Sequence, residues 1–199
     1  MIGRTLGHYR IVEKIGEGSA GETDSAGSHG RSSLRKGKRA MEKVLVGYYS
    51  RTGNTAKMAK IVADALKKEG IEVDLRTVDQ IKAADLLGFD GIVLGGPTYY
   101  GGPPAAIKEL LDESVRHHGK LDGKIGGAFT SSANVGGGNE TAVLDILQAM
   151  LIHGMIVQGD PEGDHYGPVA IQAPDARAKA NCIRFAKRLA ALVKRTAAG

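Results

Sequence analysis

The chain has 199 residues, of which 42% are hydrophobic and 25% charged, as expected for one globular domain with a short appendage. This composition excludes wholesale disorder. Because no run approaches the ~18 apolar residues of a membrane-spanning helix and no signal peptide is evident, we expect a cytoplasmic protein without membrane contact. The single cysteine, Cys182, excludes an intramolecular disulfide and is expected to pack in a helix. The six scattered histidines have no zinc-ligand spacing, so we expect no metal.

The net charge of +5 is unevenly distributed along the chain. Residues 1–42 carry 8 basic and 5 acidic side chains, a net +3, whereas residues 43–199 carry 19 and 17, a net +2. The later part is therefore nearly neutral, and the basic cluster at residues 31–39 is typical of a solvated linker. We expect no nucleic-acid partner.

Composition changes near residue 42, which predicts an N-terminal segment of residues 1–42 and a folded domain of residues 43–199. Residues 16–40 lack apolar periodicity and are expected to form a flexible linker. Residues 7–22 resemble the glycine-rich loop of a bacterial Ser/Thr protein kinase, with glycines in Gly-x-Gly-x-x-Gly spacing. The other kinase motifs are absent, so this resemblance implies a truncated remnant without kinase activity.

From residue 43 onward, short apolar runs alternate with helical patterns, which predicts a parallel sheet with crossover helices. Strands are expected at residues 44–49, 71–78, 91–95, 124–130 and 155–157. Helices are expected from the turn at 50–55 to residue 70, at 80–87, around 107–115, at 141–153 and at 175–195. This alternation predicts a single α/β domain.

The loop after the first strand is rich in hydroxyl groups and leads into a helix. Its residues are Ser50, Arg51, Thr52, Gly53, Asn54 and Thr55. Helix-start amides and hydroxyls donate hydrogen bonds to anions, so the loop suits a terminal phosphate. It has neither the P-loop ending nor the dinucleotide fingerprint. The alternative is an ordinary capped turn, with Asn54 or Thr52 as the N-cap.

Two further unusual loops follow the third and fourth strands. The second loop contains Pro97, Thr98, Tyr99, Tyr100 and Gly101, and the third contains Ser131, Ser132, Ala133, Asn134, Val135 and Gly136. The tyrosines either pack on a planar ring or cap the core, and the glycines either bring amides close to a ligand or make a flexible loop. In a sheet of order 2-1-3-4-5, all three loops leave the carboxyl ends of adjacent strands and meet at one crevice. Together they predict a flavin mononucleotide (FMN) site.

Four motifs make residues 43–195 similar to the flavodoxin superfamily, and most of all to the WrbA-type NAD(P)H:quinone oxidoreductases. They are Tyr-Tyr-Ser-Arg-Thr-Gly-Asn-Thr at 48–55, Gly-Pro-Thr-Tyr-Tyr-Gly at 96–101, Gly-Gly-Gly-Asn-Glu-Thr at 136–141 and His-Gly-Met at 153–155. The resemblance implies a flavodoxin-like, open, doubly wound, five-stranded parallel sheet of order 2-1-3-4-5. It also implies FMN phosphate at residues 50–55, the isoalloxazine against residues 98–100 with its edge near 131–136, and a homodimer or homotetramer.

The chain departs from the WrbA-type pattern around the substrate pocket. Ile152 stands where the family often has the first of two histidines, and the chain has no Trp to complete a neighbouring subunit's site. Tyr166 resembles a tyrosine that lines this pocket, although a surface turn is an equal alternative. His153 is either a proton source or a core residue, and His117 and His118 are expected to be solvated.

The resemblance implies an FMN-dependent oxidoreductase that transfers hydride from NAD(P)H to a quinone-type acceptor. A flavin accepts and returns hydride itself, so no catalytic side chain and no metal are required. The alternatives are a flavodoxin-like single-electron carrier, which tends to be more acidic than this domain, and a phosphate-ligand binding module without a redox role.

Overall fold

The structure is a computed structural model that describes residues 5–6, 9–10 and 41–198. Strands β1 (Thr5–Leu6) and β2 (Tyr9–Arg10) pair with each other in antiparallel fashion. Apart from residues 9–10, the predicted kinase-like segment at 7–22 lies outside the described residues. The predicted linker at 16–40 lies outside them as well.

A parallel sheet forms the centre of the folded domain. Its strands are β3 (Lys43–Tyr48), β4 (Glu72–Thr77), β5 (Gly91–Pro97), β6 (Ile125–Ser132), β7 (Ile156–Val157) and β8 (Val169–Ile171). The order is β4-β3-β5-β6-β7, and β8 also pairs with β6. In chain order this is 2-1-3-4-5, as predicted, with the fifth position shared by β7 beside the start of β6 and β8 beside its end.

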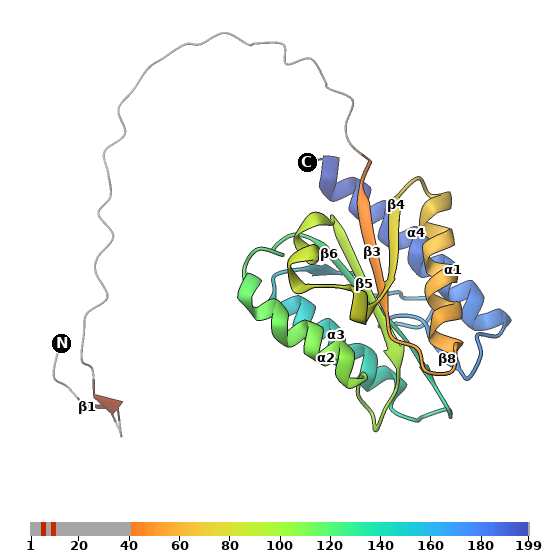
Figure 1. Ribbon diagram of the computed structural model, residues 1–199, viewed down its shortest axis with the longest axis horizontal. Coiled ribbons are helices and arrows are strands. Elements are labelled where there is room, and N and C mark those ends of the chain that lie inside the picture. Colours follow the sequence, from red (N-terminus) through yellow and green to blue (C-terminus); the bar gives the residue numbers. More distant parts are fainter. Residues whose placement is uncertain (1–4, 7–8, 11–40, 199) are drawn as a thin grey trace, which may run out of the picture. The chain divides into compact units, whose positions relative to one another are not determined.

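Helices cover both faces of the sheet (Figure 1). Helices α1 (Asn54–Lys68) and α4 (Ala176–Ala198) lie on one face, and α2 (Ala105–Ser114) and α3 (Asn139–Ile152) lie on the other. Val44 and Val46 of β3 pack in the core beneath α1 and α4, whereas Leu45 between them packs in the core beneath α2 and α3. Successive side chains of a strand point to opposite faces, so a strand covered on both faces has to be apolar throughout.

Two connections differ from the sequence prediction. The helix expected at 80–87 is instead a pair of 3-10 turns, η1 (Val78–Gln80) and η2 (Ala83–Gly88). Ile81 separates them because its backbone is extended and its side chain is buried in the core. A third 3-10 turn, η3 (Val115–His117), prolongs α2.

Within the described residues, none of the helices has both the length and the apolar character needed to cross a membrane.

The sheet is packed closely enough that some strand glycines cannot carry a side chain. A Cβ at Gly95 would lie 2.1 Å from Cζ of Phe129, whose ring is fully buried. A Cβ at Gly127 would lie 2.5 Å from Cζ of Phe185. Glycine at these positions leaves room for aromatic rings to lie against the sheet backbone.

Candidate functional site

The three predicted loops meet at the carboxyl edge of the sheet. They follow β3, β5 and β6, which are neighbours in the sheet. Hydrogen bonds join them, because Oγ1 of Thr55 lies 2.8 Å from Oγ of Ser131 and the Thr98 amide donates to the Ser131 carbonyl at 2.7 Å. The predicted convergence of the loops on one edge is therefore confirmed.

The first loop is organised around the hydroxyl of Ser50. Its oxygen accepts hydrogen bonds from the amides of Gly53 and Ala56, both at 3.2 Å. The N-cap of α1 is Gly53, with φ of 87°, and neither Asn54 nor Thr52 makes a side-chain cap. The alternative of an N-cap at Asn54 or Thr52 is therefore wrong, because the chain enters the helix through a left-handed glycine, Gly53. No acidic side chain occupies the first turn of α1, so its positive dipole end is available to an anion.

Thr55 lies beneath the first loop and connects it to the third loop. It is 1% exposed, and its partner Ser131 is 5% exposed. Ser132 is also buried, and its hydroxyl donates to the Asn134 carbonyl at 3.0 Å. The exposed hydroxyl of the first loop is that of Thr52, beside the exposed side chain of Arg51. The predicted phosphate donors therefore divide into an outer and an inner group.

The second loop is a tight turn that holds a tyrosine in solvent. Tyr99 and Gly102 exchange backbone hydrogen bonds at 2.9 and 3.1 Å, and the residues between them, Tyr100 and Gly101, have φ of 50° and 83°. Positive φ at both central residues is typical of a two-residue hairpin turn, although it is unfavourable for tyrosine. Tyr100 is fully exposed, so it does not cap the core. Tyr99 is 39% exposed and meets Tyr49 edge-to-face, with ring centroids 6.5 Å apart.

The third loop touches the second through backbone atoms. A Cβ on Gly138 would lie 2.5 Å from the Cα of Gly101, so only glycine permits this approach. Oγ1 of Thr141 lies 2.6 Å from the Gly101 carbonyl oxygen and 2.8 Å from that of Gly138. Residues 133–136 of the same loop are exposed. The third loop is therefore fixed at Gly138 and Thr141, whereas its backbone at residues 133–136 is accessible.

Tyr166 lies beside the third loop. It is 45% exposed and lines a cleft of about 410 Å³ together with Val135. The cleft also contains His165, which the sequence reasoning did not select as a site residue. Both residues belong to the connection 158–168 between β7 and β8. The sequence signal that could have identified this connection is the number of polar residues and glycines that follow the strand predicted at 155–157.

The other candidate side chains lie away from these loops. His153 follows the C-terminal end of α3, whereas the third loop precedes its N-terminal end. The Ser114 hydroxyl donates to the Leu111 carbonyl at 2.7 Å and lies 2.8 Å from Nε2 of His153, which therefore donates to it. His153 is 7% exposed, and burial, followed by the charges of His118 and His117, lowers its pKa. This is the environment of a core residue.

The structure also shows how exposed His117, His118 and Cys182 are. His118 is exposed, as expected, but His117 is half-buried, so it is less solvated than predicted. Cys182 is fully buried in α4, and burial raises the pKa of its thiol to about 12. A thiol in this environment packs as a small apolar group.

Residues 45–142 match the flavodoxin domain family. The chain is 42% identical over 159 residues to a flavodoxin of Aquifex aeolicus, an alignment that covers 75% of this chain and 86% of the relative. The chain belongs to the flavodoxin family. It is also 30% identical over 168 residues to an NAD(P)H dehydrogenase (quinone) of Archaeoglobus fulgidus, covering 67% of this chain and 88% of the relative.

Comparison with a solved structure also shows that this chain has the flavodoxin fold. The flavodoxin, WrbA-like protein from Agrobacterium tumefaciens superposes with a TM-score of 0.65 at 25% identity, covering 77% of this chain and 98% of that one. The predicted resemblance and the predicted flavodoxin-like fold are therefore confirmed. The relatives include proteins named flavodoxin and proteins named NAD(P)H dehydrogenase (quinone), so family membership alone does not assign an activity to this chain.

Proposed function

We propose that this protein binds FMN where the three loops meet and transfers hydride from NAD(P)H to a quinone-type acceptor. The observation that carries the proposal is the hydrogen-bonded convergence of the three loops at the carboxyl edge of β3, β5 and β6. This edge is the topological switch point, where ligands of open α/β sheets bind. Proteins of the flavodoxin family bind FMN, which supports the same assignment.

The first loop fits the phosphate of FMN. The start of α1 offers amides and a positive dipole end, and no carboxylate in the first turn opposes an anion. Ser50 and Thr52 add hydroxyl donors, and the Asn54 side chain adds an amide donor. We expect Thr55 to act from beneath by fixing the loop against Ser131.

The second and third loops fit a planar ring. Tyr99 and Tyr100 present aromatic surface at the rim, and the tip of the third loop presents backbone groups suited to the polar edge of an isoalloxazine. When bound, the flavin supplies the hydride chemistry at its N5. The chain has to hold the donor and the acceptor in turn against one ring face. The cleft between Val135 and Tyr166 is our candidate for the acceptor's position.

The second candidate function is a single-electron carrier, which the 42% identity to a protein named flavodoxin favours. The nearly neutral charge of residues 43–199 favours the enzyme, since carriers of this kind tend to be strongly acidic. Stopped-flow mixing of the FMN-loaded protein with NADH and with NADPH separates them. We expect at least one nucleotide to bleach the flavin rapidly and a quinone to restore its colour. Bleaching only by a reductase partner would instead assign the carrier function.

Phosphate placement is tested by replacing Thr52 with Val. The substitution removes one exposed hydroxyl from the first loop, so we expect FMN affinity to fall by about 1–3 kcal/mol, the cost of an unsatisfied acceptor. Fluorescence titration of the apoprotein with FMN measures the dissociation constant. Thr196→Val is the matched control, because the Thr196 hydroxyl donates to the Leu192 and Val193 carbonyls near the C-terminal end of α4. Unchanged FMN affinity in Thr52→Val would contradict the placement.

A further inference from the structure

The connection 158–168 has little secondary structure, yet α4 holds it in place through charged contacts. It leaves the sheet after β7 and returns at β8, and it carries Tyr166 to the cleft beside the third loop. At its return, Gly167 sits so close to β6 that a Cβ would lie 2.1 Å from the Ala128 carbonyl oxygen. Packing of Gly167 against β6 therefore fixes the end of the connection. The rest of the connection depends on its contacts with α4.

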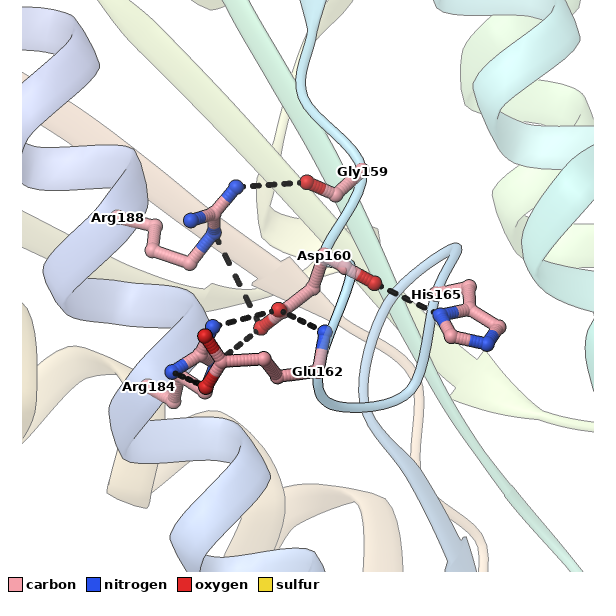
Figure 2. A network of polar contacts seen from close by, with 6 residues as sticks. All are labelled: Gly159, Asp160, Glu162, His165, Arg184 and Arg188. Atoms are coloured by element: carbon pink, nitrogen blue, oxygen red, sulfur yellow. Dashed lines mark hydrogen bonds and ion pairs between the residues drawn. The ribbon is translucent and has the colours of Figure 1, made fainter.

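The strongest of these contacts involve Asp160. Its carboxylate accepts hydrogen bonds from Nε of Arg184 at 2.6 Å and from Nη2 of Arg184 at 2.8 Å, and a third from the Glu162 amide at 3.0 Å (Figure 2). Arg188 donates to the Gly159 carbonyl at 2.8 Å. The Asp160 side chain is only 13% exposed, and the Arg184 guanidinium holds its pKa well below the usual value. Two-pronged charge-assisted contacts of this kind fix geometry as well as adding strength.

A second contact of the same type lies further along the connection. Arg177 donates to Oδ1 of Asp164 at 2.6 Å and to the Val169 carbonyl at 2.8 Å, while the Val169 amide donates to Oδ2 of Asp164 at 2.8 Å. The three arginines are seven and four residues apart, which places them on one face of α4. One helix face thus binds the connection at both ends.

Asp160 is also linked directly to the cleft. Its amide donates to the His165 carbonyl at 3.0 Å, and Nδ1 of His165 lies 2.8 Å from the Asp160 carbonyl oxygen, to which it donates (Figure 2). His165 precedes Tyr166, and both line the cleft. The backbone of Asp160 is thus paired with the residue that precedes Tyr166, while the Asp160 carboxylate is bound to Arg184 of α4.

We propose that Asp160 and Asp164, held by Arg184, Arg188 and Arg177, form a latch that positions Tyr166 and thereby determines binding of the acceptor. Asp160, Arg184 and Arg188 are positioning residues, because they do not line the cleft and act through Tyr166, whereas Asp164 and Arg177 also line the cleft themselves. The part concerning the acceptor rests on the proposed function, whereas the latch itself is a property of the chain alone. The latch is expected to leave FMN affinity unchanged, because none of its contacts involves the three loops.

The latch is tested in the apoprotein with a fluorescent reporter. The chain has no Trp, so Tyr166→Trp introduces a single probe at the cleft. In this background we compare Asp160→Asn, which keeps the shape of the side chain and removes its charge, with Lys187→Gln, which removes an exposed charge from α4 without touching the latch. We expect Asp160→Asn to lower the anisotropy of the Trp emission and Lys187→Gln to leave it unchanged.

Hydrogen exchange of peptides spanning 158–168 provides the second readout, with Tyr166 restored. Loss of a charge-assisted hydrogen bond is expected to speed exchange there by about tenfold or more in Asp160→Asn, with β6 unaffected. Unchanged exchange and anisotropy in Asp160→Asn would overturn the latch. Equal loosening by Lys187→Gln would overturn it as well, since the effect would then be one of general charge. These measurements require neither FMN nor turnover.

Steady-state kinetics then test the link to the acceptor. We expect Asp160→Asn to raise the KM for a quinone several-fold, to change kcat much less and to leave the FMN dissociation constant unchanged. In Asp160→Glu, which keeps the negative charge, the KM should lie between that of Asp160→Asn and that of the unmodified protein. An unchanged KM in a variant with a loosened connection would overturn the role in acceptor binding. Absence of quinone reduction by the unmodified protein would instead refute the proposed function, leaving the latch to be decided by exchange and anisotropy.

Discussion

The hydrogen bond between Thr55 and Ser131 gives a direct prediction about how the site is held together. Both hydroxyls are buried and lie 2.8 Å apart, although the residues are 76 positions apart in the chain. Thr55→Val preserves the branched shape but leaves the Ser131 hydroxyl without that partner. A buried polar group left unpaired costs about 1–3 kcal/mol, so we expect the apoprotein to be destabilised by that amount. For a domain of this size each kcal/mol lowers Tm by about 2–4 °C.

The double variant Thr55→Val with Ser131→Ala is the decisive comparison. With both hydroxyls removed, no polar group of the pair remains buried, and replacing both partners of a hydrogen bond can be nearly neutral. Urea unfolding of the apoprotein, the two single variants and the double variant completes a thermodynamic cycle. We expect the double variant to be more stable than Thr55→Val. If its destabilisation equals the sum of the two single changes, the hydroxyls do not interact and the reasoning is refuted.

Two further predictions concern the core. Gly95→Ala should destabilise the fold by about 1–3 kcal/mol through overpacking against the Phe129 ring, and Phe129→Leu should relieve part of this cost in urea unfolding. The lowered pKa of His153 means that the unfolded chain binds more protons than the folded one below the ordinary value of 6.5. Stability should therefore fall as the pH is lowered through and below 6.5, and less steeply in His153→Gln; equal slopes would contradict this assignment.

The sheet order and the convergence of the loops could be predicted from the sequence because they follow from local patterns. The predicted strands are short apolar runs or, at 71–78, an alternating segment, and the helices after the first, third and fourth strands carry apolar residues at helical spacing. Once the order is 2-1-3-4-5, the ends of β3, β5 and β6 are adjacent whatever the side chains are. The location of the candidate site is therefore a property of the topology, and the motifs only identify which loops are unusual.

Strand β8 could not be predicted in the same way. It has three residues, follows Pro168 and is too short for any periodicity to be measured. It exists because its residues pair with the end of β6, with Thr130 opposite Val169 and Ser132 opposite Ile171. The helix expected at 80–87 was wrong for a related reason, since Ile81 takes an extended backbone to bury its side chain in the core.

The roles of individual hydroxyls in the first loop were also beyond the sequence. Thr52 and Thr55 are the same residue type and lie three positions apart, yet Thr52 is exposed and Thr55 is only 1% exposed. Thr55 lies within the first turn of α1, where its side chain turns toward β6 and meets Ser131. That contact depends on how α1 packs across the sheet, which no local pattern encodes.

The three loops serve the cofactor in either proposed function, so they cannot separate an enzyme from a carrier. A hydride acceptor has to lie against the ring, which requires a shaped space beside the FMN loops, whereas an electron carrier needs only an exposed edge. The cleft between Val135 and Tyr166 is such a space, and it is bordered by the connection that Asp160 ties to α4. A selective rise in quinone KM in Asp160→Asn, with FMN affinity unchanged, would therefore identify both the acceptor's position and the class of reaction.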